Sequence, residues 1–404
     1  MQLNGAAAAV DSQNCGGSGN STPALRIFVA FLRLGITAFG GPAMVAYIKE
    51  LAVNKNRWLS EQSFADGTAL CQSIPGATAM QTAAYAGLRA GGPIGALAAY
   101  IGFGLPAFIL MVVLSAAYQV SRDLQPVLSA FHGLHGIVLA IVANAAVNFG
   151  KSTLKNWRDI VLASAAAIYL ILHGSPIIAI IVVAAVALFL YRGYNLPMKP
   201  GHAGASQAGR RSLKVAAMLL ILLIAGLAAL LIVNRRLLDL AALMIRVDLF
   251  AFGGGYASVP LMLHEVVDAR HWMDSKAFMD GIALGQVTPG PIVITATFVG
   301  FCIAGIPGAF IGTISVFAPS FLIVLITVPY LDRVQSSLLF RRALRGVLAS
   351  FVGLLGAVAI SFGIAVSWSV PMVFIVAGAF IALRLKVDIL WVVLAGAAVS
   401  IFVL

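Results

Sequence analysis

The chain has 404 residues, of which 61% are hydrophobic and 10% carry charge. A soluble domain holds about 25% charged residues and about 45–50% apolar ones, so this chain has more apolar surface than one aqueous core can bury. The composition excludes an ordinary soluble enzyme and predicts an all-α polytopic membrane protein. The net charge of +12 comes from basic residues in short segments between apolar runs, which argues against a nucleic-acid partner.

Taken in chain order, residues 1–23 are rich in Gly, Ala, Ser and Asn, which predicts a disordered tail. Apolar runs follow in two sets, separated by a basic linker and a connecting helix at 192–236. The first set, in the repeat 24–191, lies near 24–48, 63–88, 93–118, 125–150, 159–173 and 175–191. The second set, in the repeat 237–404, lies near 237–264, 277–303, 305–330, 346–366, 368–383 and 389–404. With the connecting run, the sequence predicts about 13 transmembrane helices.

The two halves carry copies of the same motifs. Residues 57–77 and 271–291 align without a gap at a constant offset of 214, and nine of the 21 positions are identical. Upstream, Phe39-Gly40-Gly41-Pro42 corresponds to Phe252-Gly253-Gly254-Gly255, and each motif follows an arginine, Arg33 or Arg246, by six residues. The connecting run makes the number of spans between the copies odd. The sequence therefore predicts two homologous halves in inverted orientation, as in many secondary transporters.

The basic residues predict an orientation. If the N-terminus is cytoplasmic, 18 of the 26 basic residues fall in cytoplasmic segments, which is the bias of the positive-inside rule. Lys49, Lys55 and Arg57 are exceptions, because a span over 24–48 puts them outside. We expect a protein of the bacterial inner membrane with a cytoplasmic N-terminus and a periplasmic C-terminus.

Each half contains a Pro-Gly sequence inside an apolar run, Pro75-Gly76 and Pro289-Gly290-Pro291. Proline removes a helix hydrogen bond and glycine permits non-helical backbone, so we expect a helix break at membrane depth. Exposed amides at such a break would bind an anion, with Gln72 and Gln286 as neutral donors beside it. The alternative is a proline kink without a ligand. The glycines at 40–41 and 253–254 indicate either close helix packing or a second pair of discontinuous helices.

Several ionisable residues fall within or beside the apolar runs, where each is a functional candidate. Arg33 and Arg246 would balance an anion or snorkel to the interface. Asp66 and Asp280 would cap helices or titrate during transport, and Asp248 is a further acid in an apolar run. Glu50 and Glu265 would cap, pair with basic residues or accept protons. We interpret His132, His135 and His173 as packing or hydrogen-bonded residues.

The sequence contains no Walker motif, catalytic triad or metal-ligand spacing, and Cys15, Cys71 and Cys302 are scattered. It predicts neither an enzyme nor a bound cofactor or metal. The remaining rival to a transporter is an anion channel, which needs a continuous polar lining.

Taken together, the motifs resemble the chromate ion transporter family in its two-domain form, and the resemblance covers nearly the whole chain after the tail. It rests on Phe-Gly-Gly-Pro/Gly, then a Glu and a Trp, then Phe-x-x-x-x-Ala-Leu-x-Gln-x-x-Pro-Gly, in each half. The resemblance implies efflux of chromate and chromate resistance, with an ion gradient or exchange for sulfate as the driving force. Chromate, sulfate, protons and the lipid bilayer are the implied partners, sulfate or another oxyanion is the alternative substrate, and a homodimer is left open.

Carried over by position, the family motif in the first half comprises Phe39, Gly40, Gly41, Pro42, Glu50, Trp58, Pro75 and Gly76. In the second half it comprises Phe252, Gly253, Gly254, Glu265, Trp272, Gln286, Pro289, Gly290 and Pro291. Ala77 stands where the family usually has a second proline, so the first break is expected to be less rigid.

Overall fold

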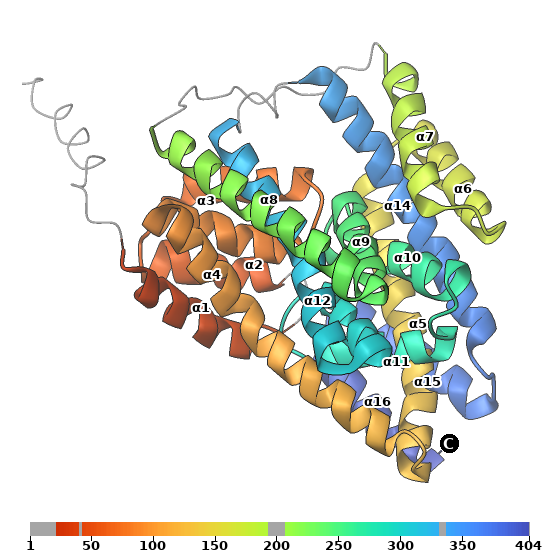
Figure 1. Cartoon of the computed structure of the whole chain (residues 1–404). Helices are drawn as coiled ribbons and strands as arrows, with labels where there is room; N and C mark the ends of the chain where they lie inside the picture. Colours follow the sequence, from red (N-terminus) through yellow and green to blue (C-terminus); the bar gives the residue numbers. More distant parts are fainter. Residues whose placement is uncertain (1–21, 40–42, 193–206, 331–336, 404) are drawn as a thin grey trace, which may run out of the picture.

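The computed structural model describes residues 22–39, 43–192, 207–330 and 337–403, and within these ranges the regular structure is helical. Most of the expected N-terminal tail, Gly40, Gly41, Pro42 and much of the basic linker lie outside the described residues. Figure 1 shows the helices as one bundle coloured along the chain, with α8 (Gln207–Val233) between the two halves in sequence.

Both halves follow the same order of elements. The first half contains α1 (Ala24–Thr37), α2 (Ala43–Lys49), the π-helix η1 (Glu50–Lys55), α3 (Glu61–Ser73), α4 (Thr78–Ser121), α5 (Gln125–Thr153), α6 (Trp157–Ile171) and α7 (Pro176–Leu190). The second contains α9 (Arg235–Phe250), η2 (Gly255–Ala257), α10 (Ser258–Leu263), the π-helix η3 (His264–Ala269), α11 (Ser275–Val287), η4 (Ile292–Ile294), α12 (Thr295–Thr327), η5 (Val328–Tyr330), α14 (Leu338–Ala365), α15 (Val370–Arg384) and α16 (Ile389–Val403). The duplication predicted from the motifs thus extends through the fold, and each half has a π-helix at the equivalent position, η1 or η3.

The expected breaks lie between short helices in both halves. Ser60 caps the start of α3 and Asp274 caps the start of α11, each by accepting a hydrogen bond from the third backbone amide that follows. Both helices end just before the Pro-Gly sequences. Gly76 has a φ of +115° and Gly290 a φ of +127°, a backbone conformation that favours glycine. Each helix is therefore ended by residues that directly follow it in the sequence.

The helices after the breaks, α4 and α12, each fold back on themselves. At Gly91 and Gly92 in α4 the backbone is non-helical, and a Cβ on Gly87 would lie 2.3 Å from the carbonyl oxygen of Gly95. Eight residues of straight helix would separate these positions by about 12 Å, so the two arms form a hairpin. In α12 the hydroxyls of Thr297 and Thr313 approach to 2.7 Å around a turn at Gly305 in the same way.

The long arms of two equivalent helices, α4 and α12, run antiparallel to each other. Along the long arms of α4 and α12, Tyr100 contacts Phe317 and Phe321, whereas Phe108 contacts Phe310. As residue numbers increase along α4, the residue numbers of the contacted positions in α12 decrease. We call the end of the bundle where α1 begins the α1 face, and the end where α9 begins the α9 face.

The number of continuous spans differs from the sequence prediction. In the described part of the chain, five helices are long and apolar enough to cross a membrane, and three shorter apolar helices occur at Pro176–Leu190, Val370–Arg384 and Ile389–Val403. The spans expected near 24–48, 63–88, 237–264 and 277–303 are instead pairs of short helices. The glycine and proline breaks divide each run, and the second helix of the pair returns beside the first.

This return also corrects the expected positions of Lys55 and Arg57. Lys55 and Asn56 line one pocket with Pro23 and Arg26, so η1 ends at the α1 face where α1 begins. The segment 49–57 is therefore not on the opposite side of the bundle from the N-terminal residues, as a span over 24–48 would require. By the equivalent return in the second half, Arg270 and Lys276 lie towards the α9 face.

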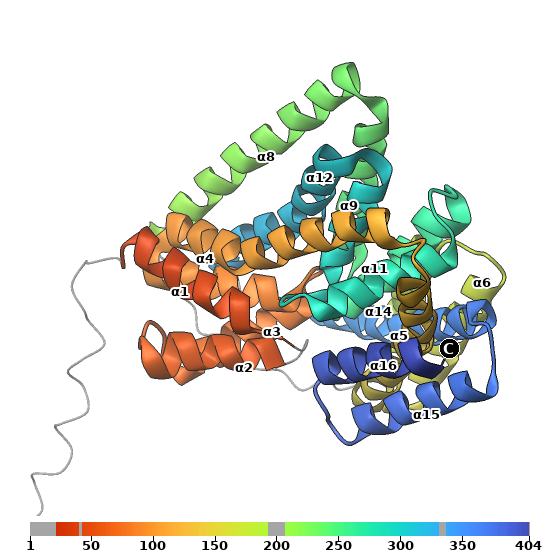
Figure 2. The same cartoon turned by 90° about the horizontal axis from the view of Figure 1, so that it is seen from below.

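Each half ends in a helical hairpin that packs on the other half. The α6–α7 hairpin packs against α14, and the α15–α16 hairpin packs against α5, as Figure 2 shows for α16. At the first contact Asp159 is fully buried, accepts hydrogen bonds of 3.0 and 2.9 Å from Arg345, and also accepts one from Tyr191. This ion pair joins the two halves near the α1 face.

We expect Arg345→Ala to destabilise the protein, because it leaves the Asp159 carboxylate buried without its cation at a cost of about 3–5 kcal/mol. The midpoint of thermal unfolding in detergent measures the effect. Arg236→Ala, at an exposed arginine, is the control and should leave the midpoint unchanged. Equal midpoints for the two variants would contradict the assignment.

Candidate functional site

Each Pro-Gly break is hydrogen-bonded to a segment of the opposite half, and the two bonds are equivalent. The Gly76 amide donates to the carbonyl of Ala251 at 2.8 Å, and the Gly290 amide donates to the carbonyl of Ala38 at 3.1 Å. Each break therefore bonds to the residue just before the Phe-Gly-Gly motif of the other half. These two glycine amides are engaged by the protein, so anion-binding amides must come from neighbouring residues.

A cavity of about 690 Å³ lies beside the two breaks. It receives Gln72, Ala77, Thr78 and Ala79 from the first break, and Gln286, Thr288, Gly290, Pro291 and Ile292 from the second. The motif glycines Gly253, Gly254 and Gly255 and the α5 residues Asn144, Asn148 and Ser152 complete much of its polar wall. The glutamines found at equivalent sequence positions thus lie in one cavity.

Several polar groups and one cation face the cavity, whose other lining residues are largely apolar. The cation is Lys49, whose ammonium donates a hydrogen bond to Glu61, and no acid lines the cavity itself. The amide nitrogen of Gln286 and the amide oxygen of Asn144 are buried without a hydrogen-bond partner among the described residues. The helical bonds of α4 begin with the Gln81 amide donating to Ala77, so the amides of Thr78 and Ala79 precede the first helical donor. These groups suit a small anion.

The cavity reaches the α1 face and is closed towards the α9 face. Asn148 and Ser152, in the last turns of α5, are exposed at its mouth, beside Lys49. On the opposite side, Ile282 and Phe278 lie one and two turns before Gln286 in α11. Both are fully buried, as is Phe298 of α12. An apolar layer therefore separates the cavity from the α9 face.

Asp280 joins the halves within this closed layer. Its carboxylate contacts His135 Nε2 at 2.7 Å and accepts a hydrogen bond from the Tyr118 hydroxyl at 2.8 Å. The acid belongs to α11 of the second half, whereas both partners belong to the first half. Its sequence equivalent Asp66 accepts a 3.0 Å hydrogen bond from Gln62 of its own helix. Within the described part of the chain, Asp66 therefore makes no cross-half contact like that of Asp280, and we call the Asp280 contact a latch on the closed side of the cavity.

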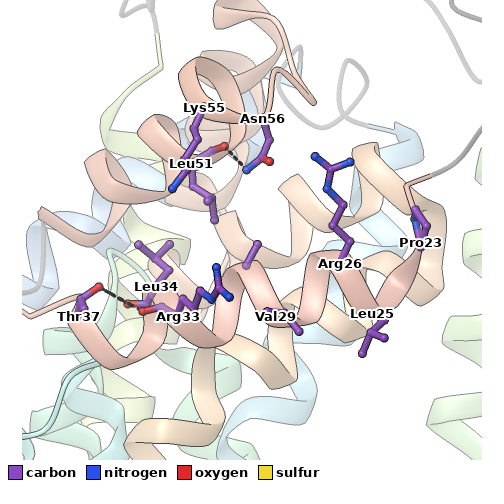
Figure 3. A pocket seen from close by; sticks show the side chains of 11 residues that line it. Pro23, Leu25, Arg26, Val29, Arg33, Leu34, Thr37, Leu51, Lys55 and Asn56 are labelled. Carbon is purple, nitrogen blue, oxygen red and sulfur yellow. Dashed lines mark hydrogen bonds between the residues drawn. The ribbon is translucent and has the colours of Figure 1, made fainter.

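Arg33 and Arg246 lie outside the central cavity. Figure 3 shows Arg33 in a separate pocket of about 720 Å³, lined also by Arg26, Lys55, Thr37 and Asn56. Arg246 instead lies 3.7 Å from the Glu265 carboxylate, which is also bound by Arg270. The two equivalent arginines thus have different surroundings, since no acid lines the pocket around Arg33.

The other expected site residues fall into two groups. Pro75, Gly76 and Pro289 form the breaks without lining the cavity, and Phe39 lies just beyond Ala38, next to residues outside the described ranges. Glu50 accepts a hydrogen bond from Asn54 in its own π-helix and does not line the cavity. Sequence reasoning placed Thr78 beside the break, and it missed Lys49, Asn144 and Asn148 as cavity residues. The signal for the two asparagines was present, since polar residues four apart share one face of an apolar helix.

We expect Asp280→Ala to open the closed layer, because it removes both contacts between α11 and the first half. In a protein whose native cysteines are replaced by alanine, Thr78→Cys reports access to the cavity. An impermeant maleimide supplied at the α9 face should label this cysteine about tenfold faster in Asp280→Ala, the shift expected for losing about 1.4 kcal/mol of closing energy. Asp239→Ala, at an exposed acid of α9, is the control. Unchanged labelling in Asp280→Ala would exclude the latch.

Comparisons with known proteins agree with this duplicated architecture. The model of the chromate transporter family matches residues 25–189 and again residues 238–401. An uncharacterized transporter from Methanocaldococcus jannaschii is 44% identical over 93% of each chain. Chromate transport proteins from Pseudomonas aeruginosa and Cupriavidus metallidurans are 31% and 29% identical, over 86% and 81% of this chain and 82% and 80% of their own length. No solved structure was found to match. The two family matches cover most of the chain, which is a multi-pass membrane transporter of the chromate transporter family.

Proposed function

We propose that the protein is a secondary transporter that exports chromate, a tetrahedral oxyanion, and that the central cavity is its substrate site. One observation carries the proposal: the two helix breaks and Lys49 line one cavity that contains no acid. A dianion requires hydrogen-bond donors and positive charge without a competing carboxylate. Amides at the start of α4, the Gln72 and Gln286 side chains and the Lys49 ammonium are groups of this kind.

The pocket around Arg33 would collect the anion before it reaches the cavity. Arg26, Arg33 and Lys55 line it without an acid, so it carries a positive potential that attracts dianions. Its lining extends to Thr37, next to Ala38, which is bonded to Gly290 of the second break. In this scheme Arg33 attracts the substrate, and Lys49 holds it by exchanging its exposed hydrogen bond to Glu61 for one to the anion. Arg246 contributes less, because Glu265 already balances its charge.

Alternating access follows from two halves inserted in opposite orientations. The antiparallel courses of α4 and α12 and the exchange of hydrogen bonds between the breaks support this arrangement. In the conformation described, the cavity reaches the α1 face and Asp280 latches the other side. Transport would release the Asp280 latch and close the mouth at Lys49 and Ser152. A continuously open channel would need a polar lining through the buried apolar layer at Phe278, Ile282 and Phe298, which argues against a channel.

We assign the α1 face to the cytoplasm. The described basic residues Arg26, Lys55, Arg57, Arg89, Lys151, Lys155, Arg158, Arg341, Arg342 and Arg345 lie in segments at this face. The α9 face has Arg122, Arg235, Arg236, Arg270 and Lys276. This asymmetry follows the positive-inside rule, with the N-terminal helix starting inside and the last helix ending outside. Export would then load from the open side of the cavity and confer chromate resistance.

We assign chromate rather than sulfate as the substrate because relatives about 30% identical are named chromate transport proteins. Sulfate has the same charge and shape and would serve as counter-substrate. Asp280 bonds to the other half, whereas its equivalent Asp66 bonds within its own helix. These two acids are therefore the candidates for coupling to the conformational change. Glu50 and Glu265, each at the start of a π-helix, are further candidates.

The test uses the purified full chain in liposomes loaded with unlabelled chromate, where uptake of labelled chromate measures exchange. We expect saturable exchange. Arg33→Gln should raise the KM about tenfold, since a long-range attraction is lost, and more than Arg246→Gln does. Lys49→Gln should lower both exchange and chromate affinity. Arg236→Gln, at an exposed arginine of the α9 face, is the matched control and should behave like the unsubstituted protein.

Exchange with sulfate inside the liposomes and no chromate would test the counter-substrate. Absence of any chromate exchange by a folded protein would contradict the proposed function. Flux that does not saturate and needs no anion on the far side would indicate a channel instead.

A further inference from the structure

A second buried acid, Asp248 near the end of α9, lies apart from the central cavity. Its side chain is fully buried, and its hydrogen bonds all come from Ser320 of α12. The Ser320 amide donates to Oδ2 at 2.7 Å, and the Ser320 hydroxyl lies 2.7 Å from Oδ1 and 2.6 Å from Oδ2. One residue of α12 therefore holds this carboxyl group.

No basic side chain balances this acid among the described residues. The described part of α12 contains no Lys, Arg, His, Asp or Glu, and neither does α10. From α4 the facing titratable group is Tyr100, whose hydroxyl donates to the Phe317 carbonyl at 2.8 Å. On α9 itself Arg246 is two residues away, on a different side of the helix, and lies against Glu265. A carboxylate here would be an uncompensated buried charge, which is costly enough to favour binding a proton.

Asp248 is connected to the first break through two neighbours. A Cβ on Gly76 would lie 1.8 Å from Ser320 Oγ, so the serine packs directly on the break. Three residues after Asp248, the Ala251 carbonyl accepts the hydrogen bond of the Gly76 amide. Any movement of the first break against α9 and α12 must therefore disturb the environment of Asp248.

This acid has no equivalent in the first half. The arginine spacing that aligns Arg33 with Arg246 places Gly35 opposite Asp248, and the hairpin turns at Gly92 and Gly305 place Ala107 opposite Ser320. A Cβ on Gly290 would lie 2.9 Å from the Ala107 side chain, so Ala107 packs on the second break as Ser320 packs on the first. The duplicated fold thus contains this site once, which gives one proton site for one central cavity.

We propose that Asp248 binds one proton in the conformation described and releases it when the first break moves, so that transport of the anion is coupled to the movement of one proton. The inference rests on the proposed function for the existence of the anion cycle. In the step, the proton leaves the Asp248 carboxyl for water on the side to which the site opens, and a carboxylate remains. Reprotonation from the other side completes the cycle, with no other reactant consumed.

The test compares two measurements on the same liposomes. The unsubstituted protein should accumulate labelled chromate when a pH gradient is imposed, and it should also exchange chromate without a gradient. Asp248→Asn, which keeps the shape of the side chain, should reduce gradient-driven accumulation to the level seen without a gradient while exchange stays within about twofold. Asp239→Asn, at an exposed acid of the same helix, is the matched control and should retain both activities.

The two proposals fail differently. Lack of exchange by the unsubstituted protein would contradict the proposed function, whereas normal gradient-driven accumulation by Asp248→Asn would overturn the role of Asp248. Ser320→Ala gives an independent test that retains the acid. Loss of the hydroxyl donor favours the protonated carboxyl, so the pH dependence of accumulation should shift to higher pH by about one unit. An unchanged pH dependence in Ser320→Ala would also overturn the proposal.

Discussion

The structure depends on how backbone polar groups at the two helix breaks are satisfied inside an apolar bundle. A helix that ends within hydrocarbon leaves amides and carbonyls without partners, which is tolerated only where protein or a polar cavity replaces water. Here Gly76 and Gly290 bond to Ala251 and Ala38, each in the opposite half. Neither break can be completed by its own half, so the two copies are obliged to meet at the centre. The cavity forms where they meet.

The same constraint explains which features could be read from the sequence. Proline and glycine act locally, so Pro75-Gly76 and Pro289-Gly290 mark breaks whatever surrounds them. The path of the chain after a break is not local, because an apolar run has the same composition whether it crosses the bundle or returns. Counting spans therefore gave about 13, and it put Lys55 and Arg57 at the wrong end. The partners of Asp280 are similarly distant in sequence, since His135 and Tyr118 belong to the other half.

Departures from symmetry between the copies carry much of the functional content. The halves share their order of helices, yet Asp280 bridges to the other half whereas Asp66 bonds within its own helix. Arg246 faces Glu265 while Arg33 lines a pocket without an acid. Asp248 and Ser320 stand where the first half has Gly35 and Ala107. A symmetric pair of halves supplies two alternative conformations, and these substitutions give the two ends of the transport path different chemistry.

The central claim is that an oxyanion binds in the cavity between the two breaks. It is tested most directly by an experimental structure of the full chain with selenate, a tetrahedral dianion whose selenium gives an anomalous signal. The account predicts an anomalous peak within the cavity, bounded by Lys49, Thr78, Gln286 and Gly290. A peak confined to other parts of the protein, or an empty cavity at a concentration that saturates transport, would contradict it.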